Sequence, residues 1–245
     1  MEEPFIVELD GGRVARAVRV SGPEDLDPAV RELDVGERAA IVVVGGASGM
    51  SKREVRRLAP LFNDVIAPLA QRLSVTVIDG GTDTGVMRLM GSARGEGAWT
   101  FPLLGVIVDE LADYSSTSDA EAFALEPNHT HFVLVPGSDW GEEAPWLAHV
   151  ATVVAGSEGS VTVLVNGGPI SVADTRHSIE AGRHIVVLDG SGRTADALAA
   201  AMRGERADPS VAALAASEFV HVVDARDRNE FAWLLDDLLA GRAVE

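Results

Sequence analysis

Glycines gather at four points where an apolar run of residues ends, and this arrangement suits a phosphorylated ligand. The stretches are IVVVGGASGM (41–50), TVIDGGTDTGVM (76–87), TVLVNGGPIS (162–171) and IVVLDGSGRTAD (185–196). Glycine lets the main chain approach a ligand closely and leaves N–H groups free to point at an anion. A helix that begins after such a turn adds partial positive charge at its N-terminus. An ordinary strand-to-helix turn explains any one stretch, whereas four at equivalent positions favour a ligand site.

The residues inside these turns favour a nucleotide over a bare phosphate. The loop Gly45–Gly49 is not a Walker A loop, because no Gly-Lys-Ser/Thr closes it. Asp79 ends a strand-like run, where doubly wound folds often place an acid that binds ribose. A helix-capping or turn aspartate is the alternative. Thr82 and Thr84 offer hydroxyl groups in the same turn.

Arg193 is the best single candidate for contacting a phosphate. It lies in a G-x-G-x-x-A pattern that begins at Gly190, although the acid expected about 20 residues later is not evident. An arginine in the first turn of a helix opposes the helix dipole. An anion therefore explains its presence better than helix stability does, with a surface salt bridge as the alternative.

Two adjacent acids, Glu142 and Glu143, are the weak candidates for catalysis. A buried glutamate can act as an acid or a base. The alternative is that both residues favour the N-terminus of a helix, where negative charge is stabilising. The sequence shows no Ser-His-Asp arrangement with a recognisable nucleophile elbow.

His129 and His131 share a strand face and have Asp139 nearby, which could hint at a metal. No third histidine is placed by the sequence, so we expect structural hydrogen bonding and no metal site. Trp140 could stack on a base, although packing within the loop is the alternative role.

Seven apolar runs alternate with longer amphipathic stretches, a pattern typical of parallel βα units. The predicted strands are 40–44, 75–79, 103–108, 131–135, 160–165, 184–188 and 219–223. A hairpin is expected over residues 4–20, turning at Asp10-Gly11-Gly12. The predicted class is an α/β fold with a doubly wound, mostly parallel sheet and an N-terminal β-hairpin. The glycine turns would then meet at the carboxyl edge of the sheet, where such folds bind ligands.

The segments between these runs carry their own signals. Ser51 and Glu54 match a capping box at the start of a helix that Pro60 and Pro68 should kink or break. The last helix is expected to follow Asp224 as N-cap and to stop at Gly241. Residues 21–38 are predicted to be a linker or short helix, and 109–130 the longest irregular stretch. We divide the chain into a hairpin and linker (1–38) and a nucleotide-binding domain (39–245).

Composition narrows the classes of partner. The chain has 245 residues, 47% of them hydrophobic and 24% charged, which are globular proportions. It has no cysteine, which excludes disulfides, thiolate metal sites and a cysteine nucleophile. A net charge of -18 repels nucleic acid and anionic lipid, so we expect neither as a partner. With no signal peptide or membrane-spanning run, we expect a cytoplasmic protein. Its apolar helices could support a homo-oligomer.

Five segments in order resemble the SLOG superfamily, the group that contains the LOG and DprA-type domains. Within it, the sequence looks most like the branch found at the N-terminus of TRPM channels and in stand-alone prokaryotic proteins. The matching segments are GGAS (45–48), GGTDTGVM (80–87) with Met90-Gly91, EPNHTHFVLV (126–135), NGGP (166–169) and DGSGRTAD (189–196). The resemblance implies a cytosolic Rossmann-like domain that binds nucleotides, with ADP-ribose-like or other NAD-derived ligands as the leading class and no required cofactor.

On this resemblance the glycine loops line the pocket. The expected ligand-binding residues are Gly45, Gly46, Ala47, Ser48, Gly80, Gly81, Thr82, Thr84, Gly85, Pro136, Gly137, Asn166, Gly167, Gly168, Gly190, Ser191, Gly192 and Arg193. The LOG branch hydrolyses nucleotide N-glycosidic bonds with the signature P-G-G-x-G-T-x-x-E. The stretch 136–143 lacks its second glycine and its Gly-Thr pair. We therefore expect a nucleotide-binding sensor or regulatory domain, with an N-glycosidic (phosphoribosyl) hydrolase as the alternative and a non-catalytic assembly module as the second alternative.

Overall fold

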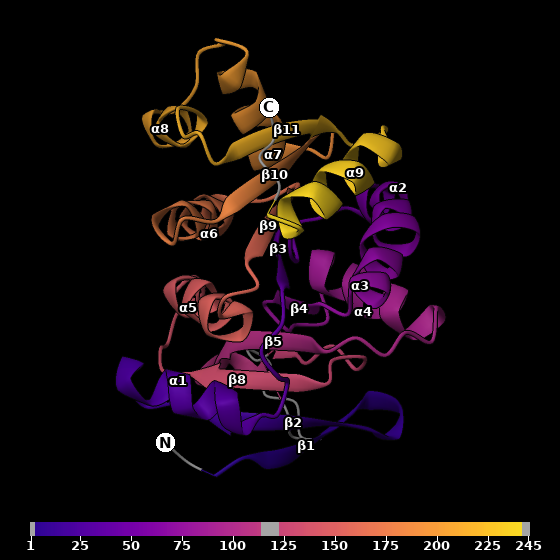
Figure 1. Ribbon diagram of the computed structural model, residues 1–245, viewed down its shortest axis with the longest axis vertical. Coiled ribbons are helices and arrows are strands. Elements are labelled where there is room, and N and C mark those ends of the chain that lie inside the picture. Colours follow the sequence, from indigo (N-terminus) through magenta and orange to yellow (C-terminus); the bar gives the residue numbers. More distant parts are fainter. Residues whose placement is uncertain (1–2, 114–122, 242–245) are drawn as a thin grey trace.

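The computed structural model describes residues 3–113 and 123–241. A nine-stranded sheet runs through the molecule, with helices on both of its faces (Figure 1). The sheet order is β1-β2-β8-β5-β4-β3-β9-β10-β11. Every neighbouring pair is parallel except β1 and β2, which form an antiparallel hairpin. The predicted fold class is confirmed.

The strands match the apolar runs of the sequence closely. They are β1 (Phe5–Leu9), β2 (Arg13–Arg19), β3 (Ala40–Gly45), β4 (Thr76–Asp79), β5 (Leu103–Val108), β8 (His131–Val135), β9 (Ser160–Val165), β10 (His184–Asp189) and β11 (Val220–Asp224). All six residues of β5 are buried, as expected for a strand that is covered on both faces. The hairpin turns at Gly11 and Gly12, both with positive φ, as predicted.

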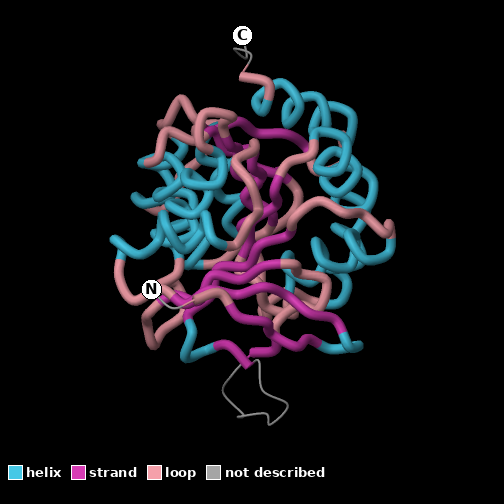
Figure 2. The backbone as a smooth tube through the Cα atoms, turned by 60° about the horizontal axis from the view of Figure 1, so that its bottom comes forward, coloured by secondary structure: helices cyan, strands magenta, loops and turns pink. Residues whose placement is uncertain are grey.

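Two helical layers cover the sheet, and each packs on its own hydrophobic cluster. Figure 2 shows the strands passing between the two groups of helices. One face carries α1 (Pro23–Glu32), α5 (Ala144–Ala155), α6 (Pro169–Glu180), α7 (Arg193–Met202) and α8 (Pro209–Ala215). The other carries α2 (Lys52–Leu61), α3 (Ala67–Leu73), α4 (Gly85–Glu96) and α9 (Arg228–Leu239). Within the described residues, no helix is both long and apolar enough to cross a membrane.

The order of the strands reverses at β3. Strands β4, β5 and β8 follow on one side of it, whereas β9, β10 and β11 extend the sheet on the other. The connections that leave β3 and β9 therefore diverge to opposite faces of the sheet. Such a switch point opens a crevice at the carboxyl ends of the strands, where α/β folds bind ligands.

One predicted helix boundary is wrong, and the others agree with the structure. Residues 23–32 form α1 with Pro23 at its start, where a missing N–H costs nothing. The N-cap of α9 is Asp227, which accepts a hydrogen bond from the Glu230 N–H, so Asp224 was the wrong cap. The capping box of Ser51 is confirmed, and the helix it begins is interrupted by a π-helical segment, η2 (Phe62–Ile66).

The stretch 109–130 is less irregular than predicted. It contains a 3-10 turn, η3 (Asp109–Leu111), and two short paired strands, β6 (Ala112–Asp113) and β7 (Phe123–Ala124). The serine-rich run 115–118 lies outside the described residues. The division at residue 38 stays a prediction, and β2 pairs with β8 in the main sheet.

Candidate ligand-binding site

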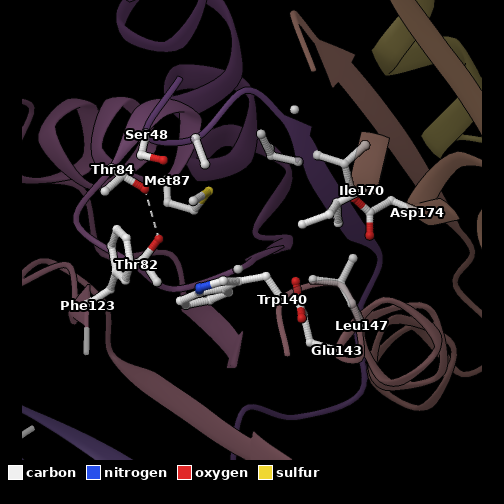
Figure 3. A pocket seen from close by; sticks show the side chains of 15 residues that line it. Ser48, Thr82, Thr84, Met87, Phe123, Trp140, Glu143, Leu147, Ile170 and Asp174 are labelled. Atoms are coloured by element: carbon white, nitrogen blue, oxygen red, sulfur yellow. Dashed lines mark hydrogen bonds between the residues drawn. The ribbon is translucent and has the colours of Figure 1, made fainter. Parts of the chain in front are cut away.

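A cavity of about 260 Å³ lies at the switch point, beside the carboxyl ends of β3 and β4. Figure 3 shows side chains from several elements converging on it. It is lined by Val43, Val44, Gly45, Ala47, Ser48, Gly80, Thr82, Thr84, Met87, Phe123, Trp140, Glu143, Leu147, Ile170 and Asp174. Two of the four glycine turns, those after β3 and β4, therefore line one cavity at this rim of the sheet.

Six of the residues expected to bind a ligand line this cavity. Gly45, Ala47 and Ser48 come from the loop after β3, while Gly80, Thr82 and Thr84 come from the turn after β4. The hydroxyls of Thr82 and Thr84 lie 3.0 Å apart, on the side of the cavity where Figure 3 also places Ser48. This side of the cavity offers hydroxyl groups and main chain.

Several of the glycines serve close packing of the main chain. A Cβ on Gly85, which has a φ of +49°, would lie 2.0 Å from the carbonyl oxygen of Gly46. A Cβ on Gly45 would lie 1.9 Å from the carbonyl oxygen of Val165. No other residue fits at these two points, so these glycines let the loop after β3 nest against α4 and β9. Gly81 packs in the same way against the Phe132 ring.

The turns after β9 and β10 form a wall beside the cavity rather than part of its lining. Asn166 is fully buried and donates hydrogen bonds to the Ser191 carbonyl (2.9 Å) and to Glu54 (3.1 Å). Its own N–H donates to Ser191 Oγ at 2.8 Å. Gly167, Gly168, Gly190 and Gly192 belong to these two turns, which Asn166 and Ser191 fasten together.

Arg193 lies beside the cavity with its guanidinium over two glycines. A Cβ on Gly49 would approach its Nη1 to 2.9 Å, and a Cβ on Gly168 would lie 3.6 Å from its Nη2. Gly49 follows Ser48, and Gly168 precedes Ile170, so the cation lies between two segments that line the cavity. Within residues 3–113 and 123–241, Arg193 forms neither an ion pair nor a side-chain hydrogen bond.

The two candidate acids have different surroundings. Glu142 is exposed and accepts hydrogen bonds from the N–H groups of Ser138 (2.7 Å) and Asp139 (3.1 Å), which lower its pKa. These two hydrogen bonds hold the loop that precedes α5 in place, and Gly137 packs against the Glu142 side chain. Glu143 lines the cavity instead, and burial raises its pKa despite a 2.7 Å hydrogen bond from the Gly141 N–H.

Asp174, an acid on α6 that lines the cavity, was not among the residues expected from the sequence. Burial and the nearby Glu143 raise its pKa to about 8. No hydrogen bond to its carboxylate comes from the described part of the chain. The available signal was helical spacing: Asp174 follows Ile170 by four residues, so the two share the helix face that borders the cavity. Trp140, considered earlier for stacking, also lines the cavity and is 38% exposed.

A buried charged cluster lies behind the turn after β4. His129 Nδ1 is 2.9 Å from Glu126, and its Nε2 is 2.9 Å from Asp79. Asp79 also accepts the N–H of Gly81 at 2.7 Å, so it shapes the turn. Burial lowers the pKa of His129, but the two carboxylates outweigh it and raise the pKa to about 9. Its role is structural hydrogen bonding, and the described residues contain no cluster of three possible metal ligands.

An open parallel sheet with a cavity at its switch point defines a Rossmann-like α/β domain. The sequence pattern of the family described as "SLOG in TRPM, prokaryote" matches residues 38–231. The chain belongs to this family, which confirms the resemblance found in the sequence.

Curated relatives of the chain include TRPM channels. Over 194 residues it is 30% identical to "Transient receptor potential cation channel subfamily M member-like 2" of Nematostella vectensis, covering 63% of this chain and 12% of that protein. Over 198 residues it is 25% identical to "Transient receptor potential cation channel subfamily M member 2" of Mus musculus, covering 65% of this chain and 13% of that protein. The chain thus spans about an eighth of the length of these relatives.

Among solved structures, the molybdenum cofactor carrier protein of Chlamydomonas reinhardtii is similar in fold. The match has a TM-score of 0.51 at 17% identity and covers 82% of this chain and 99% of that one. At this identity the likeness concerns the fold alone.

Proposed function

We propose that this protein is a cytosolic sensor or regulatory domain that binds a nucleotide of the ADP-ribose or NAD-derived class in the cavity at the switch point. The main support for the proposal is the position of the Arg193 guanidinium. Its cation has no partner in the described chain, and it lies between the loop after β3 and the start of α6. Guanidinium groups bind phosphate through two parallel hydrogen bonds, so this position suits a ligand phosphate.

Main-chain groups support an anion at the same rim. The N-cap of α4 is Thr84, which forms no capping hydrogen bond through its side chain, and the start of this 12-residue helix borders the cavity. The Val86 N–H of this first turn donates to the Gly46 carbonyl at 2.9 Å, so the dipole of the helix, rather than a row of free N–H groups, favours negative charge there. The hydroxyls of Thr82 and Ser48 are suited to ribose or phosphate oxygens. A site of this kind needs no resident cofactor.

The size of the cavity restricts how a ligand is held. At about 260 Å³ it lies just below the usual range for pockets that enclose a drug-sized ligand. It therefore takes one half of a dinucleotide, and the remainder extends over the rim towards Arg193. The apolar side chains of Trp140 and Ile170, 38% and 36% exposed, would be covered by the enclosed half.

Calorimetry with ADP-ribose, NAD, AMP and cyclic ADP-ribose tests the proposal. We expect at least one ligand to bind below millimolar, and Arg193→Ala to weaken it by about tenfold. Arg176→Ala is the matched control, because it removes an exposed arginine of α6 that pairs with Glu180 on the same helix. Failure of all four ligands to bind below millimolar would refute the proposal.

A second candidate function is hydrolysis of a nucleotide N-glycosidic bond. Glu143 favours it, since its carboxyl faces the cavity and burial raises its pKa, as a general acid or base requires. Chromatography for released base or ribose phosphate tests this activity. Glu143→Gln should abolish turnover, while Glu142→Gln, which alters only the loop, should retain most of it. No turnover across a broad panel of nucleotides would exclude hydrolysis of those substrates.

A further inference from the structure

Two carboxyl groups on neighbouring helices face one end of the cavity. Glu143 lies at the start of α5, and Asp174 lies on α6, which packs against α5. Both line the cavity, together with the apolar side chains of Leu147 and Ile170 (Figure 3). This end of the cavity carries acidic groups, whereas the other side carries the hydroxyls of Thr82 and Thr84.

In the described part of the chain, no ion pair joins either carboxyl group to a positive side chain. Among the described residues that line the cavity, none is lysine, arginine or histidine. Glu143 accepts one main-chain hydrogen bond, from Gly141, and Asp174 accepts none from the described chain. Burial and the nearby Glu143 raise the pKa of Asp174 to about 8, so this carboxyl is largely protonated at neutral pH. A half-buried pair of carboxyl groups without a positive side chain beside it favours a cation as ligand.

An aromatic wall adjoins the two acids. Figure 3 places the Trp140 indole between Phe123 and Glu143. The Phe123 and Trp140 rings meet edge to face, with centroids 5.2 Å apart. The face of an indole attracts a cation, and a flat ring can stack on it. The cavity volume of about 260 Å³ admits a single heterocycle with its sugar.

We infer that Glu143 and Asp174 form a subsite for a positively charged nitrogen heterocycle of the pyridinium class, which stacks against Trp140. The inference rests on the proposed function for the placement of the ligand phosphates towards Arg193, and it names the half of the ligand that enters the cavity. A neutral ring would leave the acid pair uncompensated, and an anionic ring would be repelled.

Oxidised and reduced NAD form a matched pair of probes, because they share all phosphates and differ in the charge of the nicotinamide ring. We expect wild type to bind NAD⁺ at least about tenfold more tightly than NADH. Asp174→Asn and Glu143→Gln should each bring the affinities for NAD⁺ and NADH to within about twofold of each other, mainly by weakening the binding of NAD⁺. Glu180→Gln is the control, since it removes an exposed acid from the same helix as Asp174 and should retain the preference.

A probe without phosphate separates this inference from the proposed function. The 1-methylnicotinamide cation has no phosphate and no glycosidic bond, and NMR titration should show saturable binding to wild type that is lost in Asp174→Asn. If nucleotides fail to bind but this cation binds in that manner, the proposed function falls and the cation subsite stands. If nucleotides bind while NAD⁺ and NADH bind equally, or the preference survives both substitutions, the inference is overturned. Failure of every probe to bind would overturn both.

Discussion

Nε2 of His129 lies 2.9 Å from Oδ1 of Asp79, and both side chains are fully excluded from solvent. The contact joins the segment before β8 to the end of β4, directly behind the turn that lines the cavity. A second carboxylate, Glu126, holds the other nitrogen of the ring. A buried imidazolium between two carboxylates is stable only as a complete set, because removing one member leaves unpaired charge.

His129→Asn should destabilise the protein by about 3–5 kcal/mol, since it removes the cation from two buried carboxylates. Urea unfolding at pH 7 measures the change. His149→Asn is the control: His149 is 44% exposed and pairs with Asp27 on the surface, so its loss should change the free energy of unfolding by less than about 0.5 kcal/mol. Equal effects of the two substitutions would contradict a buried ion cluster.

The same histidine should make stability depend on pH. Its pKa rises from 6.5 in the unfolded chain to about 9 in the folded one, so the folded state binds the proton more tightly. This contribution is fully present below pH 6.5 and is lost as pH rises through 9, for a total of about 3 kcal/mol. Unfolding curves from pH 6 to 10 should show the decline in wild type and a flatter profile in His129→Asn.

Asp174→Asn should stabilise the protein at pH 8 while weakening the proposed cation subsite. The carboxyl has a pKa of about 8 in the folded state against an ordinary value of 3.8, so the wild-type fold loses stability as pH rises from 4 to 8. Asparagine removes this penalty, and we expect a gain of about 2 kcal/mol at pH 8, because solvent screens a side chain that is only half-buried. At pH 4 the gain should vanish, and thermal unfolding at the two pH values makes the comparison.

Gly85→Ala should cost about 3 kcal/mol or more, because it adds a clash with the Gly46 carbonyl to a strained positive φ. Gly190→Ala provides the matched control. Gly190 also has a positive φ, of +84°, but no atom lies within 4 Å of the added Cβ, so the cost should be about 1 kcal/mol. Chemical denaturation of both variants separates backbone strain from close packing. A similar cost at both positions would show that the loop after β3 yields to the added methyl group.

Most of the sheet could be predicted from the sequence because a parallel strand covered on both faces needs a continuous apolar run. Strands β5, β8 and β9 begin and end where the runs do. For residues 21–38 the sequence left a linker and a short helix open, and the structure shows helix α1 there, with Pro23 at its start. A proline in the first turn of a helix costs no hydrogen bond, so Pro23 can begin α1.

The convergence of the glycine turns could also be predicted, but the role of each residue could not. Whether a glycine faces a ligand or a neighbouring main chain depends on packing between distant turns, as for Gly45 against Val165. The choice between Glu142 and Glu143 depends on the rotation of the first turn of α5. Asp174 could not be predicted, because the residues around it in the sequence do not indicate that this face of α6 borders a cavity.

Arg193→Gly should separate stability from binding in a single substitution. Arg193 adopts a φ of +52°, a left-handed conformation that glycine adopts without strain, and its side chain has no partner in the described residues. Replacement by glycine should therefore raise the free energy of unfolding by about 1 kcal/mol in the absence of ligand. The same change removes the guanidinium beside Gly49 and Gly168, so nucleotide affinity should fall by about tenfold. Thermal unfolding with and without ADP-ribose measures both effects. If the variant is more stable but ADP-ribose raises its unfolding temperature as much as that of wild type, Arg193 does not contact the ligand.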